Sequence, residues 1–242
     1  MISHKKYKGK KGRLIGYDDK ESIYLYEDED KRNSPFEGDD IFPSIPNDYD
    51  FVLIGGPSGS GKTVWASKYI AAYKKKYKKR PIYVISSINE DPALDKYNVI
   101  RLNLEDCFGD PDYEIDPESM KDSLVLFDDV DTLTSKKLRD NVLTFRDFLL
   151  EQGRHFNIHL INTVHILLNY KATRRLLNES TKVVIFPKSG TSYQIKTFLQ
   201  TYCGFMKEQI THFFKSDNKS RWKMVSKTYP LYVMSQHEIY PV

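Results

Sequence analysis

One stretch, residues 51–63, constrains this chain more than any other part of it. It reads FVLIGGPSGSGKT, an apolar run followed by a glycine-rich loop that ends in Lys62 and Thr63. The spacing G-x-x-x-x-G-K-[ST], placed between a strand pattern and a helix start, predicts a phosphate-binding loop, because glycine lets backbone N–H groups approach phosphate oxygens. We expect ATP to be bound by Gly56, Pro57, Ser58, Gly59, Ser60, Gly61, Lys62, Thr63 and Val64.

Two side chains of this loop have expected chemical roles. Lys62 is long enough to reach the β- and γ-phosphates, and the hydroxyl group of Thr63 is placed to hold Mg²⁺. The N-terminus of the following helix favours an anion through its unpaired N–H groups and its dipole. A surface loop rich in glycine and serine is the alternative interpretation, and the complete motif between a strand and a helix argues against it.

A second apolar run, Ser123 to Asp131, predicts the other half of the site. It reads SLVLFDDVD, the pattern of a buried strand that ends in carboxylates. The carboxyl ends of strands are where α/β sheets bind ligands, so Asp128 is expected to ligate Mg²⁺ together with Thr63. In ATPases of the additional-strand type, the residue after the metal-binding aspartate polarises the attacking water and is commonly glutamate. Asp129 has this place here, and because its side chain is one methylene shorter, Asp131 is an alternative.

Composition and charge set the class of protein. The 242 residues are 40% hydrophobic and 13% aromatic, which excludes a disordered chain and fits one large α/β domain. Cys107 and Cys203 form no C-x-x-C motif, so a reducing, intracellular setting is expected. No apolar run approaches ~18 residues and no apolar segment follows the basic start, so we predict a soluble protein without a membrane span or signal peptide. A net charge of +4 permits a polyanionic partner.

The core is predicted to alternate strands with helices. This alternation predicts an α/β fold with a mainly parallel sheet, flanked by helices and joined by right-handed crossovers. An irregular insertion is expected before Met120, where prolines and acidic residues are frequent. The expected helices are residues 64–77, 136–152, 171–178, 191–200 and 205–214, and the expected strands are residues 82–87, 98–104, 158–164, 182–186, 221–226 and 231–234.

Three segments follow from this pattern. Residues 1–49 form an N-terminal arm with a basic start and a short strand at Ser22–Tyr26. Residues 50–190 form the nucleotide-binding core, and residues 191–242 add helices and strands that pack on it. The start of the arm, residues 1–13, is either a flexible arm for the DNA backbone or a solvated terminus.

Two more basic clusters have two interpretations each. The lysines at 74–76 complement a helix dipole at a solvated helix end, which we prefer, or they contact DNA. Residues 215–227 include Trp222 and either cap the domain, which we prefer, or hold a phosphate backbone, with Arg221 among the contacts.

The order of four segments resembles one family. These segments are GGPSGSGKT, LVLFDDV, FLLEQGRHFNIHLINTVH and TRRLLNESTKVVIFP. Together they resemble the genome-packaging ATPases of poxviruses, other large DNA viruses and their virophages, within the FtsK–HerA superfamily. The resemblance covers about residues 50–190. It implies a RecA-like P-loop NTPase with an additional strand between the strand of the phosphate loop and the strand that ends in Asp128.

The resemblance also implies how the site is completed. In this family ATP lies between subunits of a homo-oligomeric ring, a pentamer or hexamer around duplex DNA, and an arginine from the neighbour stabilises charge on the γ-phosphoryl group. Arg154 is the first candidate, and Arg174 and Arg175 follow. Arg139 and Arg146 are expected to be solvated helix residues. His165 has the place of a γ-phosphate-sensing glutamine, with a buried core histidine as the alternative.

The interpretation that unites these observations is an ATP-driven motor that packages viral double-stranded DNA into a preformed capsid. The resemblance implies a capsid or portal protein as a partner, and a location in the host cell cytoplasm, at the virus assembly site and transiently at the capsid vertex. The alternatives are a nucleoside or nucleotide kinase and an ATP-binding, DNA-binding switch with little turnover. A GTPase is disfavoured because the sequence lacks the N-K-x-D motif that recognises guanine.

Overall fold

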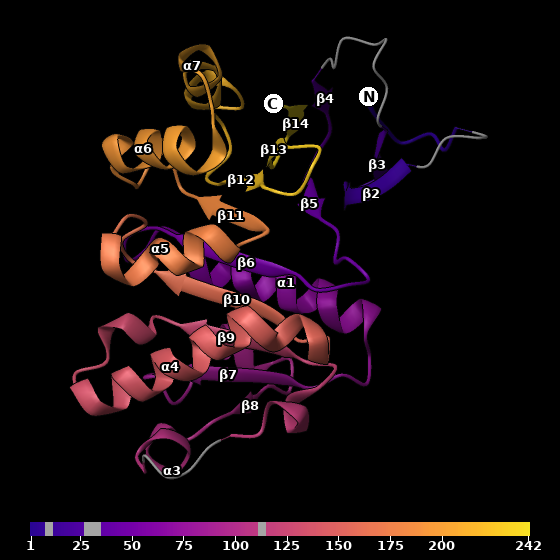
Figure 1. Cartoon of the computed structure of the whole chain (residues 1–242). Helices are drawn as coiled ribbons and strands as arrows, with labels where there is room; N and C mark the ends of the chain where they lie inside the picture. The colour runs from indigo at the N-terminus through magenta and orange to yellow at the C-terminus, as the bar shows by residue number, and fades with distance from the viewer. Residues whose placement is uncertain (8–11, 27–34, 111–114) are drawn as a thin grey trace. The chain divides into compact units, whose positions relative to one another are not determined.

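The computed structural model describes residues 1–7, 12–26, 35–110 and 115–242, together with the backbone but not the side chains of residues 170–172. The chain forms two compact units (Figure 1). The first joins residues 1–46 with 181–242, and the second is residues 47–180. The predicted segments 1–49 and 191–242 therefore fall largely in one unit. Across the described residues, no helix is both long and apolar enough to cross a bilayer.

The second unit is built on parallel strands. Each neighbouring pair in its sheet is parallel, which confirms the predicted parallel α/β fold. The strand order is β6 (Phe51–Gly55), β10 (His159–Val164), β9 (Leu124–Asp128), β7 (Ile82–Ser86) and β8 (Ile100–Arg101). Strand β10 lies between β6 and β9, which is the additional strand that the resemblance implied.

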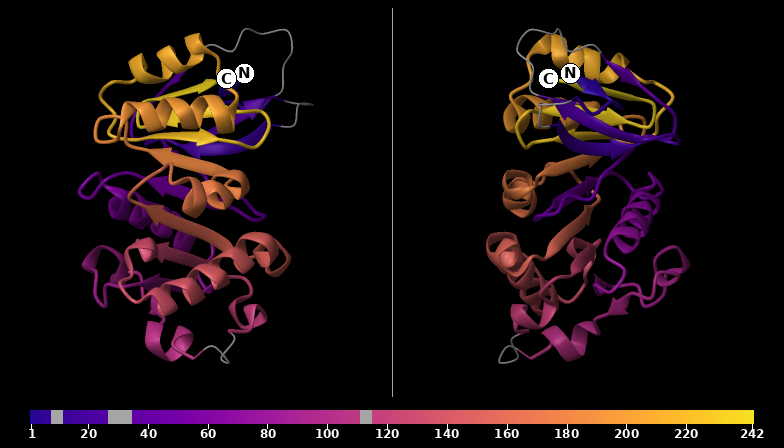
Figure 2. Two further views of the ribbon diagram at one scale, coloured as in Figure 1. Left: turned by 60° about the vertical axis from the view of Figure 1, so that its left-hand side comes forward. Right: turned by 90° about the vertical axis from the view of Figure 1, so that its right-hand side faces the viewer.

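Helices on both faces explain why these strands are buried throughout. Every residue of β6, β9 and β10 is buried, as parallel strands covered on two faces require. Helices α1 (Lys62–Lys76) and α2 (Pro92–Asp95) lie on one face, and α4 (Lys136–Gln152) and α5 (Tyr170–Glu179) lie on the other (Figure 2). These helices agree closely with the predicted ranges 64–77, 136–152 and 171–178.

The segment between β7 and β9 differs from its prediction. The strand expected at 98–104 is short, and part of the expected irregular insertion is helical, as α3 (Leu104–Phe108) and η1 (Pro117–Met120). The physical reason is local capping, because the side chains of Asn103 and Asp116 each accept backbone N–H groups of the first turn. The short 3₁₀ helices η2 (Val130–Thr132) and η3 (Gly153–Phe156) flank α4.

The first unit contains an antiparallel sheet and two helices. Its strands follow the order β11 (Lys182–Ile185), β12 (Lys223–Ser226), β13 (Tyr232–Ser235), β14 (Glu238–Pro241) and β4 (Phe36–Glu37). Helices α6 (Ser192–Cys203) and α7 (Lys207–Lys215) precede β12. The predicted elements of residues 191–234 are thus present, whereas β14 and β4 were not predicted.

The chain's first residues form a second sheet rather than a free arm. Its order is β1 (Ile2–Ser3), β3 (Ser22–Tyr26), β2 (Gly12–Tyr17) and β5 (Phe42–Pro43). The side chain of Arg13 donates hydrogen bonds to the carbonyl oxygens of Tyr229 and Pro230 at 3.0 and 3.1 Å. The prediction of a flexible or solvated terminus is therefore wrong for residues 2–3 and 12–13. The lysines at 8, 10 and 11 lie outside the described residues.

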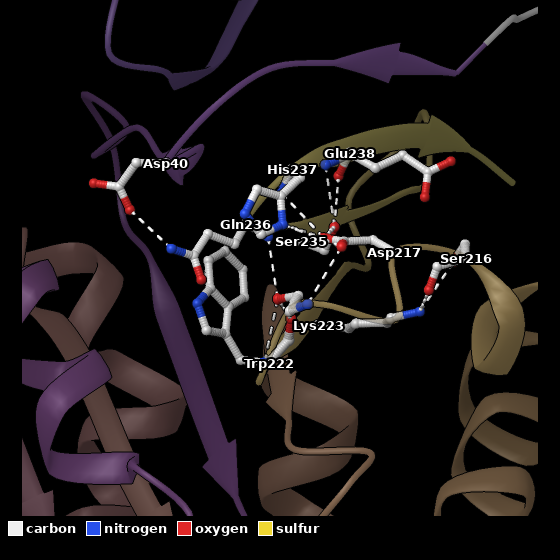
Figure 3. Close-up of polar contacts among 10 residues, drawn as sticks. Asp40, Ser216, Asp217, Trp222, Lys223, Ser235, Gln236, His237 and Glu238 are labelled. Carbon is white, nitrogen blue, oxygen red and sulfur yellow. Dashed lines mark hydrogen bonds and ion pairs between the residues drawn. The ribbon is translucent and has the colours of Figure 1, made fainter.

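A polar cluster joins distant segments of this unit (Figure 3). Asp217 accepts hydrogen bonds from the hydroxyl of Ser235 at 2.6 Å and from the backbone N–H of His237 at 3.1 Å. Lys223 is 3% exposed, and its ammonium group donates to the carbonyl and hydroxyl oxygens of Ser216 at the end of α7. Lys223 therefore caps the end of α7 and is not available for a phosphate contact, whereas the choice between a domain cap and a phosphate contact for the rest of residues 215–227 stays a prediction.

Candidate nucleotide-binding site

The phosphate loop connects β6 to α1 and has the backbone of an anion cradle. Gly59 and Gly61 have positive φ angles of 74° and 113°, which only glycine adopts readily. Gly61 is the N-cap residue of α1 and supplies no side-chain cap. The first helical turn contains no acidic residue. The start of α1 is thus suited to a phosphate group, which the helix dipole attracts.

Lys62 contacts two other predicted site residues, Asp129 and His165. Its side chain is 6% exposed, and Nζ donates to the carbonyl oxygen of Gly56 at 3.1 Å. Nζ also lies 3.6 Å from Oδ2 of Asp129 and 3.4 Å from Nδ1 of His165. The same Oδ2 is 2.9 Å from Nε2 of His165. Lys62, Asp129 and His165 therefore form a closed triangle, and a phosphate group that binds Lys62 has to compete with the Asp129 carboxylate.

Asp128 is a buried carboxylate whose contacts offset little of the free-energy cost of burying its charge. It ends β9, is 4% exposed, and its Oδ1 lies 2.9 Å from Oγ1 of Thr163. Burial raises its pKa, the Thr163 hydroxyl opposes that rise, and the charge of Asp129 adds to it. A cation beside Asp128 would relieve the cost of burying its charge.

This donor set fits Mg²⁺ better than a metal that prefers nitrogen or sulfur. Asp128 supplies a carboxylate and Thr63, in the first turn of α1, supplies a hydroxyl group. Among the described residues no group of three or more His, Cys, Asp or Glu side chains is arranged to hold a metal. Mg²⁺ commonly binds through one or two protein ligands, phosphate oxygens and water, so it does not need such a cluster.

Asp129 and Asp131 differ in their surroundings. Asp129 has a left-handed backbone, with φ 48° and ψ 35°, and its carboxylate contacts Lys62 and His165. Asp131 has one buried oxygen, Oδ1, without a hydrogen-bond partner in the described structure. Burial, followed by the charge of Asp129, raises the pKa of Asp131. Asp129 is thus the carboxylate that contacts Lys62 and His165, and its role in orienting water stays a prediction.

The candidate arginines lie in different places. Arg154 is exposed on η3, just before the first residue of β10, whereas the phosphate loop follows the last residue of the parallel strand β6. Arg154 therefore lies at the edge of its own sheet opposite the phosphate loop. Arg174 and Arg175 are exposed on α5, and Arg175 pairs with Asp147 and Glu151, each at 3.2 Å.

The two arginines expected to be solvated are not. Arg146 is 5% exposed and donates two hydrogen bonds to Oδ1 of Asp147, at 3.0 and 2.7 Å. Arg139 is half-buried and donates to the carbonyl oxygen of Leu133 at 3.1 Å. This part of the prediction is wrong because α4 turns these positions inward, and a long side chain can bury its stem while its guanidinium group finds an acceptor.

Sequence reasoning missed Thr163, which contacts both predicted carboxylates. Its Oγ1 is 2.9 Å from Oδ1 of Asp128 and 2.9 Å from Oδ1 of Asp129. A signal was present, because β10 reads HLINTV and is buried throughout. Polar residues inside a buried strand are informative, since they need partners.

Comparison with known proteins agrees with this fold. The sequence profile of the Novel STAND NTPase 3 family matches residues 43–190. "Uncharacterized protein V3" of Sputnik virophage is 37% identical over 241 residues, which cover 98% of this chain and 91% of that protein. The predicted resemblance to virophage proteins and the predicted NTPase class are confirmed by these two matches.

Two solved structures share the fold at low sequence identity. The pCW3 conjugation coupling protein TcpA, in its monomer form with ATPγS, has a TM-score of 0.57 and 12% identity over 97% of this chain and 67% of that chain. B204, the DNA-packaging ATPase of Sulfolobus turreted icosahedral virus, has a TM-score of 0.50 and 13% identity over 79% of this chain and 98% of that chain. These likenesses confirm the P-loop NTPase architecture.

Proposed function

We propose a function from one premise: the chain belongs to the Novel STAND NTPase 3 family. The chain hydrolyses ATP and uses the energy to move viral double-stranded DNA into a preformed capsid. The main support for ATP hydrolysis is that the side chains of Lys62, Asp129 and His165 contact one another beside the phosphate loop. Side chains directly after β9 and β10 and at the start of α1 thus converge where a phosphate group is expected.

The residues divide the chemistry among them. Backbone N–H groups of the loop and Lys62 bind the β- and γ-phosphates, and Thr63 with Asp128 would hold Mg²⁺, which when bound neutralises phosphate charge. Once Lys62 turns to phosphate, Asp129 loses a cationic partner and becomes free to orient water. His165 is the proposed sensor of the γ-phosphate, and its contact with that carboxylate at 2.9 Å supports this role.

A neighbouring subunit completes the site in this proposal. Arg154 lies at the opposite edge of its own sheet, so any effect on the phosphoryl group must act on another copy's nucleotide. Such an arginine accelerates phosphoryl transfer by about 10³- to 10⁵-fold. The family resemblance supports a ring of identical subunits, five or six in number, and Arg174 and Arg175 are the other candidates for the arginine that acts in trans.

Double-stranded DNA is the proposed cargo. Support comes from the family resemblance and from two proteins that share the fold, a DNA-packaging ATPase and a conjugation coupling protein. Candidate phosphate contacts are the lysines at 5 and 6, the group at 74–76 that ends α1, and Arg221. The capsid or a portal protein is the proposed docking partner, at the capsid vertex in the host cytoplasm.

ATP hydrolysis by the purified full chain tests this function. We expect Mg²⁺-dependent turnover that rises with duplex DNA of any sequence and loses that stimulation as salt rises, because phosphate contacts release counterions. Turnover that requires a nucleoside and yields a phosphorylated nucleoside in equal amount would show a kinase instead. Tight ATP binding with DNA but no turnover would show a switch, and either result would overturn the motor.

A further inference from the structure

Thr163 is a buried hydroxyl at the centre of the site that has no role in the proposed chemistry so far. It is the fifth residue of β10, is 0% exposed, and β10 lies between β6 and β9. Its Oγ1 accepts a hydrogen bond from the backbone N–H of Asp129 at 2.8 Å. The same oxygen lies 2.9 Å from one carboxylate oxygen of Asp128 and 2.9 Å from one of Asp129.

A hydroxyl group cannot serve both carboxylates at once. It carries one proton and two lone pairs, and here one lone pair is already used by the N–H of Asp129. The single proton is therefore donated either to Asp128 or to Asp129. Because both distances are equal, the position of that proton depends on which carboxylate has another cationic partner.

Thr163 also supports an unusual backbone conformation. Asp129 has φ 48°, a left-handed conformation that a non-glycine residue keeps only when its surroundings hold it. Thr163 holds the N–H of Asp129, and Thr132 holds its carbonyl oxygen through a hydroxyl at 2.7 Å and a backbone N–H at 3.1 Å. The direction of the Asp129 side chain is thus set by hydrogen bonds on both sides of its Cα.

We propose that Thr163 is a positioning residue that couples the metal-binding carboxylate of Asp128 to the water-orienting carboxylate of Asp129. When a divalent cation binds Asp128, the hydroxyl proton turns to Asp129 and fixes that carboxylate toward water. Without the cation, the hydroxyl donates to Asp128, and the carboxylate of Asp129 contacts Lys62 and His165 instead. This inference rests on the proposed ATP hydrolysis and adds to it a link between metal binding and the orientation of the catalytic carboxylate.

The test compares Thr163→Val, which removes the hydroxyl at nearly constant shape, with Thr163→Ser, which keeps it. For Thr163→Val we expect kcat to fall by roughly 10- to 100-fold, the size of effect that slight misplacement of a catalytic group produces, with KM for ATP within about twofold. Thr163→Ser should keep kcat within about threefold. Thr173→Val is the matched control, because Thr173 is another buried threonine of this unit, on α5, and its hydroxyl bonds to the backbone of Asn169, the residue before that helix.

A double variant separates positioning from loss of stability. If Thr163 acts through Asp129, Thr163→Val should lower kcat no further in an Asp129→Asn background, because the two residues work as one unit. Independent, multiplicative losses would overturn the proposal. Wild-type turnover by Thr163→Val would also overturn it. If the valine variant does not fold by circular dichroism, Thr163→Ala takes its place in each comparison.

A second readout does not depend on turnover. Binding of a fluorescent non-hydrolysable ATP analogue is measured while Mg²⁺ is titrated from a metal-free start. The hydroxyl donates to Asp128 in the metal-free state and to Asp129, which also has Lys62 and His165 as neighbours, in the metal-bound state. Because the hydrogen bond to Asp128 is the one with less other compensation, Thr163→Val should lower the half-effect Mg²⁺ concentration by about two- to threefold, part of the free energy of one hydrogen bond, whereas Thr163→Ser and Thr173→Val should not. A shift in a protein without ATPase activity would refute the proposed hydrolysis and keep the coupling, and an unchanged midpoint would overturn the coupling.

Discussion

Two aspartates with little-exposed side chains, one in each compact unit, differ in how many hydrogen-bond donors surround their carboxylates. Asp217 accepts hydrogen bonds from the Ser235 hydroxyl, from the backbone N–H groups of Ser220 and His237, and lies 3.1 Å from the His237 ring (Figure 3). Asp128 shares the single hydroxyl proton of Thr163 with a neighbouring carboxylate. The carboxylate of Asp217 therefore has several hydrogen-bond donors, whereas that of Asp128 shares one.

The pKa shifts follow this difference. Burial would raise the pKa of Asp217, but hydrogen bonds from Ser235 and His237 lower it below its usual value. Burial raises the pKa of Asp128, and its hydrogen bond from Thr163 does not reverse that. A carboxylate that the protein surrounds with hydrogen-bond donors has a structural role. A buried carboxylate with few hydrogen-bond donors is suited to bind a cation that arrives with a ligand.

Of the substitutions that test this difference, Asp129→Asn is expected to change the rate of ATP hydrolysis most. Removing the charge that orients water should lower kcat by about 10²- to 10⁴-fold while Mg·ATP binding stays intact. Single-turnover kinetics together with analogue binding measure the two separately. Near wild-type hydrolysis would transfer the role to Asp131, whose buried oxygen lacks a partner in the described structure.

Asp217→Asn should have the reverse profile. It leaves buried donors without their charged acceptor, and we expect the free energy of unfolding to fall by about 2–4 kcal/mol, with kcat per folded molecule unchanged. Urea denaturation and ATPase assays measure the two quantities. Asp40→Asn is the matched control in the same cluster, because Asp40 is exposed and accepts from Gln236 at 3.3 Å, and its effect should be within about 0.5 kcal/mol. Loss of turnover in folded Asp217→Asn would remove the distinction between the two aspartates.

The stabilisation from Asp217 should also depend on pH, with a sign fixed by its lowered pKa. The contribution is complete above the unfolded-state value of about 3.8 and declines as pH falls through the lower folded-state value. The stability difference between wild type and Asp217→Asn should therefore be constant from about pH 5 to 8 and shrink below about pH 4. Constancy down to pH 3 would contradict the assignment.

The sequence predicted those parts of the molecule that local patterns encode. The phosphate loop and the strand ending at Asp128 each lie in one short segment, so spacing and apolar character suffice to predict them. The contacts of Thr163 depend on strand order, since β10 comes between β6 and β9 only in the folded sheet. The apolar pattern of residues 158–164 predicts a buried strand, but it does not predict which polar side chains contact that strand.

The first unit shows the same limit more strongly. Its cluster depends on backbone pairs such as Gly38 N–H with the His237 carbonyl and Ile41 N–H with the Gln236 carbonyl, which join the two ends of the chain. No local pattern records such pairing, so the sequence alone predicts an arm for residues 1–49. Short strands such as β4 and β14 gain stability from partners distant in sequence, and their own propensity is weak.

Thermal unfolding with a non-hydrolysable ATP analogue, with and without Mg²⁺, tests most directly the claim that Asp128 is the metal half of a nucleotide site. At about 100 times the dissociation constant, binding adds roughly 2.7 kcal/mol, or about 5–10 °C in Tm. We predict that Mg²⁺ increases the shift in wild type, that Asp128→Asn keeps only the metal-independent part, and that Asp217→Asn melts earlier yet shows the full Mg²⁺-dependent shift. An equal Mg²⁺-dependent shift in wild type and Asp128→Asn would contradict the account.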